Sequence, residues 1–422
     1  MTTMTSRQRL KNALSHKDGP VPIDLGGTMV TGIHVSVVAA LRERLGLEKR
    51  LVKAIDPGQM LGAVDEDLKQ ALGIDVEAVR AMNTRYGFPL NEGWKEWRTP
   101  WGQEILVSGG FTTSTEPNGD ILIYPQGDRQ APPSACIPAS GYFADTIVRQ
   151  EPIDDDKLNP ADNLEEFTPI SEAALVHFHR EVEAASKTGR GVIAGFGGTA
   201  LGDIGAVPAP ALKHPKGIRD VEEWYISTVA RQDYLHAVFE GQVRIALDNL
   251  ERIRAKLGPL VDAVDAVYLC GADYGTQAST FCSSETFNEL YMPHYKAITG
   301  WIHRNTPWKC FKHSCGAIAP LLPVLIEAGF DIINPVQCSA AGMDPEMLKQ
   351  KFGHDLVFWG GGVDTQKTLP FGTPDEVRRE VRERLRVFAP GGGFVFTPVH
   401  NIQACTPVEN LLAMYEEVGK HR

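Results

Sequence analysis

The chain alternates strand-like and helix-like segments along most of its length, and this alternation limits the folds that it can adopt. Short apolar runs are followed by longer segments in which apolar and charged residues repeat with helical spacing. This pattern is typical of a parallel sheet whose strands are joined by crossover helices. The eight runs that predict strands are Val21–Leu25, Ile74–Val79, Val192–Phe196, Ala263–Leu269, Trp308–Phe311, Ile332–Val336, Leu356–Trp359 and Gly393–Val399.

Amphipathic segments between these runs predict the crossover helices. Three of them begin with a capping residue followed by proline, at Thr373-Pro374, Asp344-Pro345 and Thr406-Pro407, which is a common start of a helix. Eight strands with intervening helices predict a (β/α)₈ TIM barrel, formed as a single domain by residues 1–422. The predicted helices are Ala173–Ser186, Val221–Leu257, Ser284–Arg304, Ile318–Ala328, Pro345–Phe352, Pro374–Phe388 and Pro407–Val418.

Residues 83–163 interrupt the alternation. They are rich in Trp, Gly and Pro and contain short β-like pieces. Because loops at the carboxyl ends of barrel strands carry function, we expect this segment to be an insertion after the second strand that forms a lid over the barrel mouth. A separate small domain is the alternative.

The composition excludes several classes of protein. The net charge is −11 and no long basic cluster occurs, which argues against nucleic-acid binding. No apolar run approaches the roughly 20 residues that a membrane span requires. The 7 cysteines are an odd number in a chain that shows no secretory signal, so we expect reduced thiols and a cytoplasmic protein. The sequence is compatible with a homodimer.

Histidine and cysteine follow two of the predicted strands. His313 and Cys315 come after the fifth strand, and His400 and Cys405 come after the eighth. Imidazole and thiolate are the ligands that Zn²⁺ prefers, and the carboxyl ends of all barrel strands lie at the same rim. We therefore predict a metal site, with either His400 or Cys405 as the third ligand.

Three further residues are candidates for the same rim. Asp273 follows the fourth strand and could act as an acid or base, as a fourth metal ligand, or only as a helix cap. Tyr274 and Gln337 are candidates for orienting a substrate. The other cysteines are weaker candidates for a role at this rim, because each could simply be a small buried residue of the core.

Several motifs resemble the uroporphyrinogen decarboxylase superfamily, and within it the branch of corrinoid-dependent methyltransferases. They are "VPIDLGGT" at 21–28, "DEDLKQALGIDV" at 65–76, "CGADYGTQ" at 270–277, "HSCGAIAPLLPVLIEAGFDIINPVQ" at 313–337, "FWGGGVDTQ" at 358–366 and "TPVHNIQACTPVEN" at 397–410. The resemblance implies a (β/α)₈ barrel and a His-x-Cys…Cys zinc motif. The sequence departs from that motif, because His400 stands where the third ligand is expected and Cys405 is displaced.

The resemblance implies methyl transfer between a small substrate and a corrinoid (methylcobamide or cobalamin) carried on a partner protein, with Zn²⁺ bound by the enzyme. The aromatic residues of the insertion favour a small aromatic methyl ether as the methyl donor, although the same rings could form a mini-core. A metal-independent decarboxylase is the alternative enzyme, and a catalytically silent subunit that binds a corrinoid protein is the alternative from another class.

Overall fold

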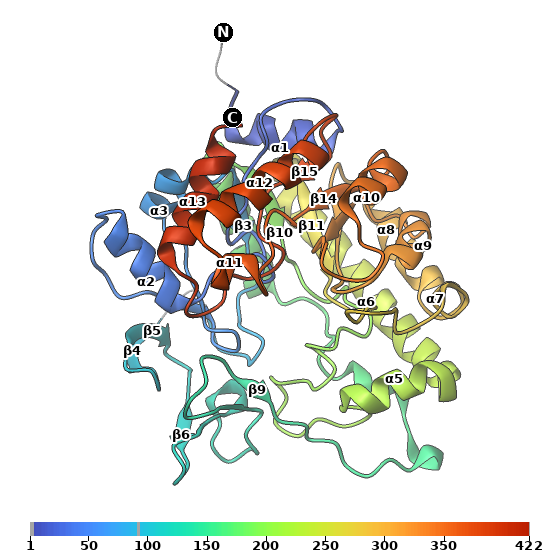
Figure 1. Cartoon of the computed structure of the whole chain (residues 1–422). Helices are drawn as coiled ribbons and strands as arrows, with labels where there is room; N and C mark the ends of the chain where they lie inside the picture. The colour runs from blue at the N-terminus through green and yellow to red at the C-terminus, as the bar shows by residue number, and fades with distance from the viewer. Residues whose placement is uncertain (1–3, 91–92, 422) are drawn as a thin grey trace.

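A curled parallel sheet surrounded by helices forms the centre of the computed structural model, which describes residues 4–90 and 93–421 (Figure 1). The strands lie in the order β15-β14-β13-β12-β11-β10-β3, and every neighbouring pair is parallel. Their bounds are β3 Val76–Val79, β10 Gly191–Ala194, β11 Ala266–Cys270, β12 Lys309–His313, β13 Ile332–Asn334, β14 Val357–Trp359 and β15 Phe394–Val395.

The first predicted strand lies in the gap between the two edges of this sheet. Ile23 forms a parallel bridge with Phe396, and the Asp24 amide donates to the Phe396 carbonyl at 2.9 Å. On the other side, the Asp75 amide donates to the Ile23 carbonyl at 2.8 Å. Residues 21–25 therefore stand at the eighth position of the ring, although they form a single bridge rather than a full strand. The structure confirms the predicted α/β TIM-barrel-like fold.

Alternation along the strands fills the barrel interior. Side chains of successive strand residues point to opposite faces, so every second residue enters the ring. Helix α1 (Ser6–Leu14) closes one end, because Leu10 and Leu14 belong to the same buried cluster as the interior residues. From the sheet that cluster contains Val76, Ile193, Ala266, Phe311, Ile332, Val357, Trp359 and Val395.

The outer helices lie mostly where the helical periodicity predicts them, but two predicted helices are divided. The segment 221–257 breaks at Arg231, whose backbone φ is −136°, and the segment 284–304 breaks at Tyr291, just before Pro293. Among the described residues, no helix is long and apolar enough to cross a membrane. The helices are α1 Ser6–Leu14, α2 Val35–Arg44, α3 Glu66–Leu72, α4 Glu172–Ser186, α5 Val221–Ala230, α6 Gln232–Leu257, α7 Ser284–Leu290, α8 Met292–Asn305, α9 Leu322–Glu327, α10 Pro345–Phe352, α11 Thr368–Phe371, α12 Pro374–Phe388 and α13 Val408–Gly419.

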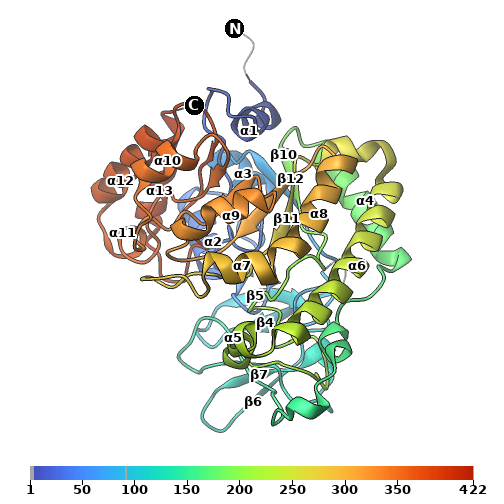
Figure 2. The ribbon, with the colours of Figure 1, turned by 90° about the vertical axis from the view of Figure 1, so that its right-hand side faces the viewer.

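The segment from residue 83 to 163 follows β3 and folds into small antiparallel sheets. Figures 1 and 2 both show its strands at the end of the molecule opposite α1. Its aromatic side chains pack on one another: Trp97 lies 5.2 Å from Phe111 and Trp101 lies 5.3 Å from Tyr142, between ring centroids. The short strands in and before it are β1 Ala54–Asp56, β2 Leu61–Gly62, β4 Trp94–Arg98, β5 Glu104–Ser108, β6 Thr113–Thr115, β7 Ile121–Ile123, β8 Ala135–Ile137 and β9 Asp145–Thr146.

Candidate metal centre

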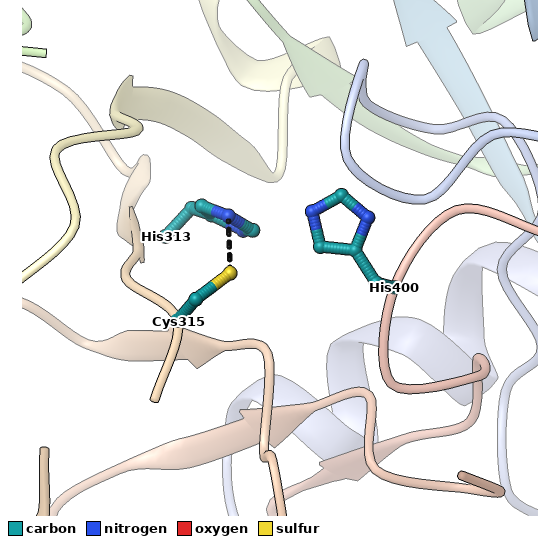
Figure 3. Close-up of side chains that lie close together, drawn as sticks. All are labelled: His313, Cys315 and His400. Carbon is teal, nitrogen blue, oxygen red and sulfur yellow. Dashed lines mark hydrogen bonds between the residues drawn. The ribbon is translucent and has the colours of Figure 1, made fainter. Parts of the chain in front are cut away.

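Three side chains from the carboxyl ends of two barrel strands meet at the rim. His313, Cys315 and His400 each offer one ligand atom, and these atoms lie within 4.8 Å of one another. Figure 3 shows His313 and Cys315 on one side and the His400 ring approaching from the facing loop. The two imidazole centroids are 5.3 Å apart. The sequence positions of these residues differ by up to 87, so the closed barrel is what brings them together.

The register of the sheet positions and orients His313. Phe311 belongs to the interior cluster, and His313, two residues further along β12, therefore points to the same face above it. In the neighbouring strand β13, Asn334 pairs with His313, and its Oδ1 atom accepts a 2.6 Å hydrogen bond from Nδ1. The Asn334 Nδ2 group donates to the Trp359 carbonyl at 2.6 Å, which fixes the amide orientation. The Nε2 lone pair of His313 is thus left for a ligand.

Cys315 is held by the loop that follows β12. Its backbone amide donates to Asp273 Oδ1 at 2.7 Å, and its Sγ atom lies 3.4 Å from Nε2 of His313. The next residue must be glycine, because Gly316 has a φ of +89° and an added Cβ would lie 2.5 Å from backbone atoms of Gly275. The close contact between these two loops sets the position of the thiol.

Burial controls the protonation of the cluster. Desolvation lowers the pKa of His313 to about 4, with a smaller effect of the Lys312 cation, and the Asn334 hydrogen bond opposes the shift. Desolvation, followed by the neighbouring His313, also lowers the pKa of His400 to about 4. For Cys315, burial and then the Asp273 carboxylate raise the thiol pKa well above its usual range. At neutral pH the cluster without a cation holds two neutral imidazoles and a protonated thiol.

A pocket of about 260 Å³ opens beside the cluster. Cys315 and His400 line it, together with Gln337, whose Oε1 atom accepts a 2.8 Å hydrogen bond from the Gly316 amide. Loop residues including Thr276 and Asp364 complete the wall. The cluster is therefore open to a small molecule on one side while the barrel shields it on the other.

The remaining predicted residues occupy different surroundings. Cys405 is exposed, has a φ of +63°, and does not belong to the group of close ligand atoms. The Oδ1 atom of Asp273 lies 3.9 Å from Nε2 of His313, so this carboxylate is next to the cluster. Tyr274 is 2% exposed, its hydroxyl lies 3.3 Å from that of Tyr295, and its ring packs against Phe287 and Tyr291, so it belongs to the core beside α7 and α8 and is not one of the residues that line the pocket.

Two residues that sequence reasoning missed support the site. Asn334 orients His313, and the polar residue at the tip of a strand next to a predicted ligand was the available signal. Lys312 is fully buried, and its Nζ donates to the carbonyls of Ala272 and His313 at 2.5 and 2.6 Å. It thereby joins the ends of β11 and β12, and no simple sequence pattern reveals this role.

A second group of potential ligands lies at the other end of the sheet. His303, Cys310 and Asp331 have ligand atoms within 4.8 Å of one another. However, the Lys309 ammonium is 2.8 Å from the Asp331 carboxylate, so a cation already occupies this position, and burial raises the pKa of the Cys310 thiol. The group is at the amino ends of β12 and β13, away from the rim where barrel enzymes place their catalytic groups.

Comparisons with known proteins agree with this architecture. Residues 248–421 match the model of the uroporphyrinogen decarboxylase family. No protein with a curated description matches the chain by sequence. Among solved structures, a methyltransferase from Methanosarcina mazei is similar with a TM-score of 0.54 and 14% identity, over 99% of this chain and 99% of that chain. At this identity the structural similarity shows a shared fold. The residues that match the family model, 248–421, contain His313, Cys315 and His400. The resemblance of this chain to the uroporphyrinogen decarboxylase superfamily is therefore confirmed.

Proposed function

We propose that this protein is a zinc-dependent methyltransferase that moves a methyl group between a small substrate and a corrinoid carried on a partner protein. The observation that carries the proposal is the convergence of His313, Cys315 and His400 at the barrel rim, beside an open pocket. The match to the decarboxylase family and the fold shared with a methyltransferase support it.

The spacing of the ligand atoms suits zinc. Bond lengths of about 2.0–2.1 Å to nitrogen and about 2.3 Å to sulfur, at a tetrahedral angle, separate the two ligand atoms by about 3.5 Å. The observed separation of Cys315 Sγ and His313 Nε2 is 3.4 Å. Zinc sites that act in catalysis use three protein ligands and keep one position for water or substrate. The three side chains and the adjacent pocket meet both requirements.

His400 is better placed than Cys405 to act as the third zinc ligand. Its imidazole lies in the cluster and is neutral at pH 7, so a lone pair is available. Cys405 is exposed on a loop outside the cluster. In this protein a His-x-Cys…His ligand pattern would therefore replace the His-x-Cys…Cys pattern of the corrinoid-dependent methyltransferases that it resembles.

The protein's own residues prepare the centre for this chemistry. Asn334 holds His313 with its Nε2 atom toward the cluster, an arrangement that typically strengthens metal binding. Asp273 is close enough to accept or return the proton of a substrate or of Cys315. When bound, Zn²⁺ would supply Lewis acidity that stabilises negative charge on the substrate oxygen or sulfur.

The transfer itself requires one bond exchange. The bond from the methyl carbon to the substrate oxygen or sulfur would break, and the cobalt(I) of the partner's corrinoid, as the methyl acceptor, would supply the electron pair of the new bond to that carbon and so become cobalt(III). The electron pair of the broken bond stays on the oxygen or sulfur atom, at the position that faces Cys315 and His400 in the pocket. The reverse reaction would start from a deprotonated thiol or alcohol at the same position.

A spectrophotometric assay tests the proposal. Cob(I)alamin is offered with candidate methyl donors, including methoxylated aromatics, methyl thioethers and methylamines, and the formation of methylcobalamin is recorded. Wild-type protein with one equivalent of zinc should form methylcobalamin with at least one donor class. Cys315→Ala should lose both zinc and activity, and Cys405→Ala should keep both.

The same variants separate the alternatives. Release of CO₂ from a carboxylated substrate at full rate in Cys315→Ala would support the metal-independent decarboxylase instead. Binding of zinc and of a corrinoid protein without turnover of any donor would support a silent binding subunit.

A further inference from the structure

A second pocket lies across the barrel mouth from the metal centre. Its volume is about 260 Å³, and its wall comes from the ends of β3, β10 and β11 and from the loop after residues 21–25. This size is at or below the range of about 300–1,000 Å³ that is usual for drug-sized ligands, so the pocket suits a small molecule rather than a tetrapyrrole. Its apolar lining includes Met29, Ile55, Leu61, Val79, Leu90 and Leu269.

Arg80 brings a positive charge into this apolar pocket. It is the first residue after β3, at the same rim as His313, because both follow the carboxyl ends of parallel strands. Its Nη2 atom donates to the Gly26 carbonyl, and within residues 4–90 and 93–421 this is the one hydrogen bond of its guanidinium group. Arg80 lines the pocket, and its other guanidinium nitrogens are not among the fully buried, unpartnered polar atoms of the described residues. A guanidinium group carries five N–H donors, and most of those of Arg80 therefore remain available.

The carboxylates nearest to Arg80 are engaged elsewhere. Glu77 forms ion pairs with Lys69 and with Arg190, and Glu181 pairs with Arg180. Asp24 accepts hydrogen bonds from Trp359 Nε1 at 2.8 Å and from the Gly27 amide at 2.8 Å. Burial lowers the pKa of Arg80 despite these three acids, so their attraction does not offset the desolvation of its charge.

The second arginine of the pocket is better compensated. Arg85 is attracted most strongly by Asp56 and next by Asp203 among the carboxylates, and its pKa is raised rather than lowered despite burial. Both carboxylates line the same pocket. Arg80 is thus the cation of this pocket that is short of a counter-charge.

We infer that Arg80 binds an oxyanion group of the substrate, a carboxylate above all, while the apolar wall holds the rest of the molecule. A planar carboxylate can accept two parallel hydrogen bonds from a guanidinium group, which neither a neutral amide nor an ether can do. The inference rests on the proposed function and adds that the methylated substrate is a small, mostly apolar acid.

The two pockets lie at the same rim, and their walls come from neighbouring strands: the end of β11 contributes to the Arg80 pocket, and the loop after β12 contributes to the pocket beside the cluster. Tyr268 of β11 lines the Arg80 pocket and is paired with Phe311 of β12, two residues before His313. The anionic end of a substrate would lie at Arg80, and its methylated end would extend toward Cys315. In this arrangement the acid group sets the orientation and the metal centre receives the leaving atom.

Calorimetric titration at pH 7 tests the inference without any methyl transfer. The probes are benzoate, 4-methoxybenzoate and cyclohexanecarboxylate, each compared with its primary amide, on wild-type protein with and without zinc. At least one acid should bind about tenfold more tightly than its amide, because a hydrogen-bonded charge pair in an apolar pocket contributes about that factor. Arg80→Gln should reduce the preference to less than about threefold, and Arg80→Lys should keep part of it. The matched control Arg254→Gln, at an exposed arginine of α6 that pairs with Glu251, should bind like wild type.

Equal binding of acids and amides to wild type would overturn the inference, and so would an unchanged acid preference in Arg80→Gln. If Arg80→Gln does not fold, the wild-type comparison and Arg80→Lys decide. An acid preference without methylcobalamin formation from any donor would contradict the proposed function alone. Transfer from methoxylated amides as fast as from the matching acids would contradict the anion site alone.

Discussion

A single hydrogen bond sets the ligand atom of His313. Its Nδ1 group donates to Asn334, whose amide is itself held by the Trp359 carbonyl, so the ring has little freedom to turn. Outer partners of this kind fix the orientation of a ligating imidazole and thereby strengthen metal binding. Asn334 therefore belongs to the metal centre although it does not contact the proposed ion.

Asn334→Ala should weaken zinc binding by about 10–100-fold, because the imidazole would lose its fixed orientation. Competition with a chromophoric chelator measures the effect. The matched control is Asn410→Ala, which removes a buried asparagine that bonds to Leu369 and Gly372 of the outer layer. Equal zinc affinity in the two variants would show that the hydrogen bond to His313 has no role in binding.

The desolvated histidines of the cluster should make the stability of the metal-free protein depend on pH. The folded-state pKa of His400 is about 4, below its ordinary value of 6.5, so the unfolded chain binds more protons between these values. The stability contributed by this group is complete above about pH 6.5 and falls as the pH drops toward 4. Between pH 7 and pH 5 a group of this kind costs about 2 kcal/mol of unfolding free energy.

His400→Gln should abolish the part of the pH dependence that comes from His400. The unfolding free energy of this variant in urea should therefore fall less than that of wild type between pH 7 and pH 5. His354→Gln, at an exposed histidine, is the control and should behave like wild type. An identical pH dependence in all three proteins would mean that His400 is not buried in its neutral form.

The residues of the proposed metal centre could be predicted from the sequence, whereas their hydrogen-bond partners could not. His313, Cys315 and His400 are recognisable because metal-binding residue types directly follow strand-like runs. The choice between His400 and Cys405 depends on the path of one loop, in which Cys405 adopts a φ of +63° and stays exposed. Asn334 and Lys312 act through contacts between strands, and these contacts require the register of the sheet.

At the scale of the elements, helix α1 closes one end of the barrel, a role that its sequence alone does not predict. Leu10 and Leu14 seal the end of the barrel at which the strands begin, whereas the proposed metal centre lies at their carboxyl ends. Leu10 packs against Gly191 at the start of β10 so closely that a Cβ on this glycine would lie 2.2 Å from Leu10 Cδ2. The glycine makes room for the helix that closes the barrel.

Leu10→Ala should lower the unfolding free energy by about 2–5 kcal/mol, because it leaves a cavity in a fully buried position. Zinc affinity should stay within about twofold of wild type, since the change is at the far end of the strands. Urea unfolding and chelator competition measure the two quantities. Val229→Ala, at a 79% exposed side chain of α5, should change neither, and a loss of zinc affinity in Leu10→Ala would contradict the separation of the two ends.

Element boundaries were predicted well where local chemistry determines them. Helices α10 and α12 begin and end at the predicted residues, and a proline at the first helical position follows the cap in both. Long-range contacts decided the rest. The predicted helix 221–257 breaks at Arg231, whose side chain forms ion pairs with Asp155 of the inserted segment and with Glu223 of α5. The helical periodicity of the sequence does not predict these ion pairs.

At the scale of the whole molecule, the closed ring of strands creates the proposed site. β12 and β15 are separated by β13 and β14 in the sheet, yet the loops after them bring their side chains together across the rim. The ring depends on residues 21–25, which join β15 to β3 through a few backbone hydrogen bonds. The alternation of the sequence predicts this ring, but the side chains that meet across it follow only from the folded structure.

X-ray absorption at the zinc edge, with metal analysis of the same samples, tests the central claim most directly. The purified protein should bind about one zinc per chain, with one sulfur at about 2.3 Å and two imidazole nitrogens at about 2.0–2.1 Å. Cys405→Ala should give the same spectrum, whereas Cys315→Ala should lose the sulfur contribution and most of the metal. Two sulfur ligands in wild type, or zinc that remains fully bound in Cys315→Ala, would contradict a centre built from His313, Cys315 and His400.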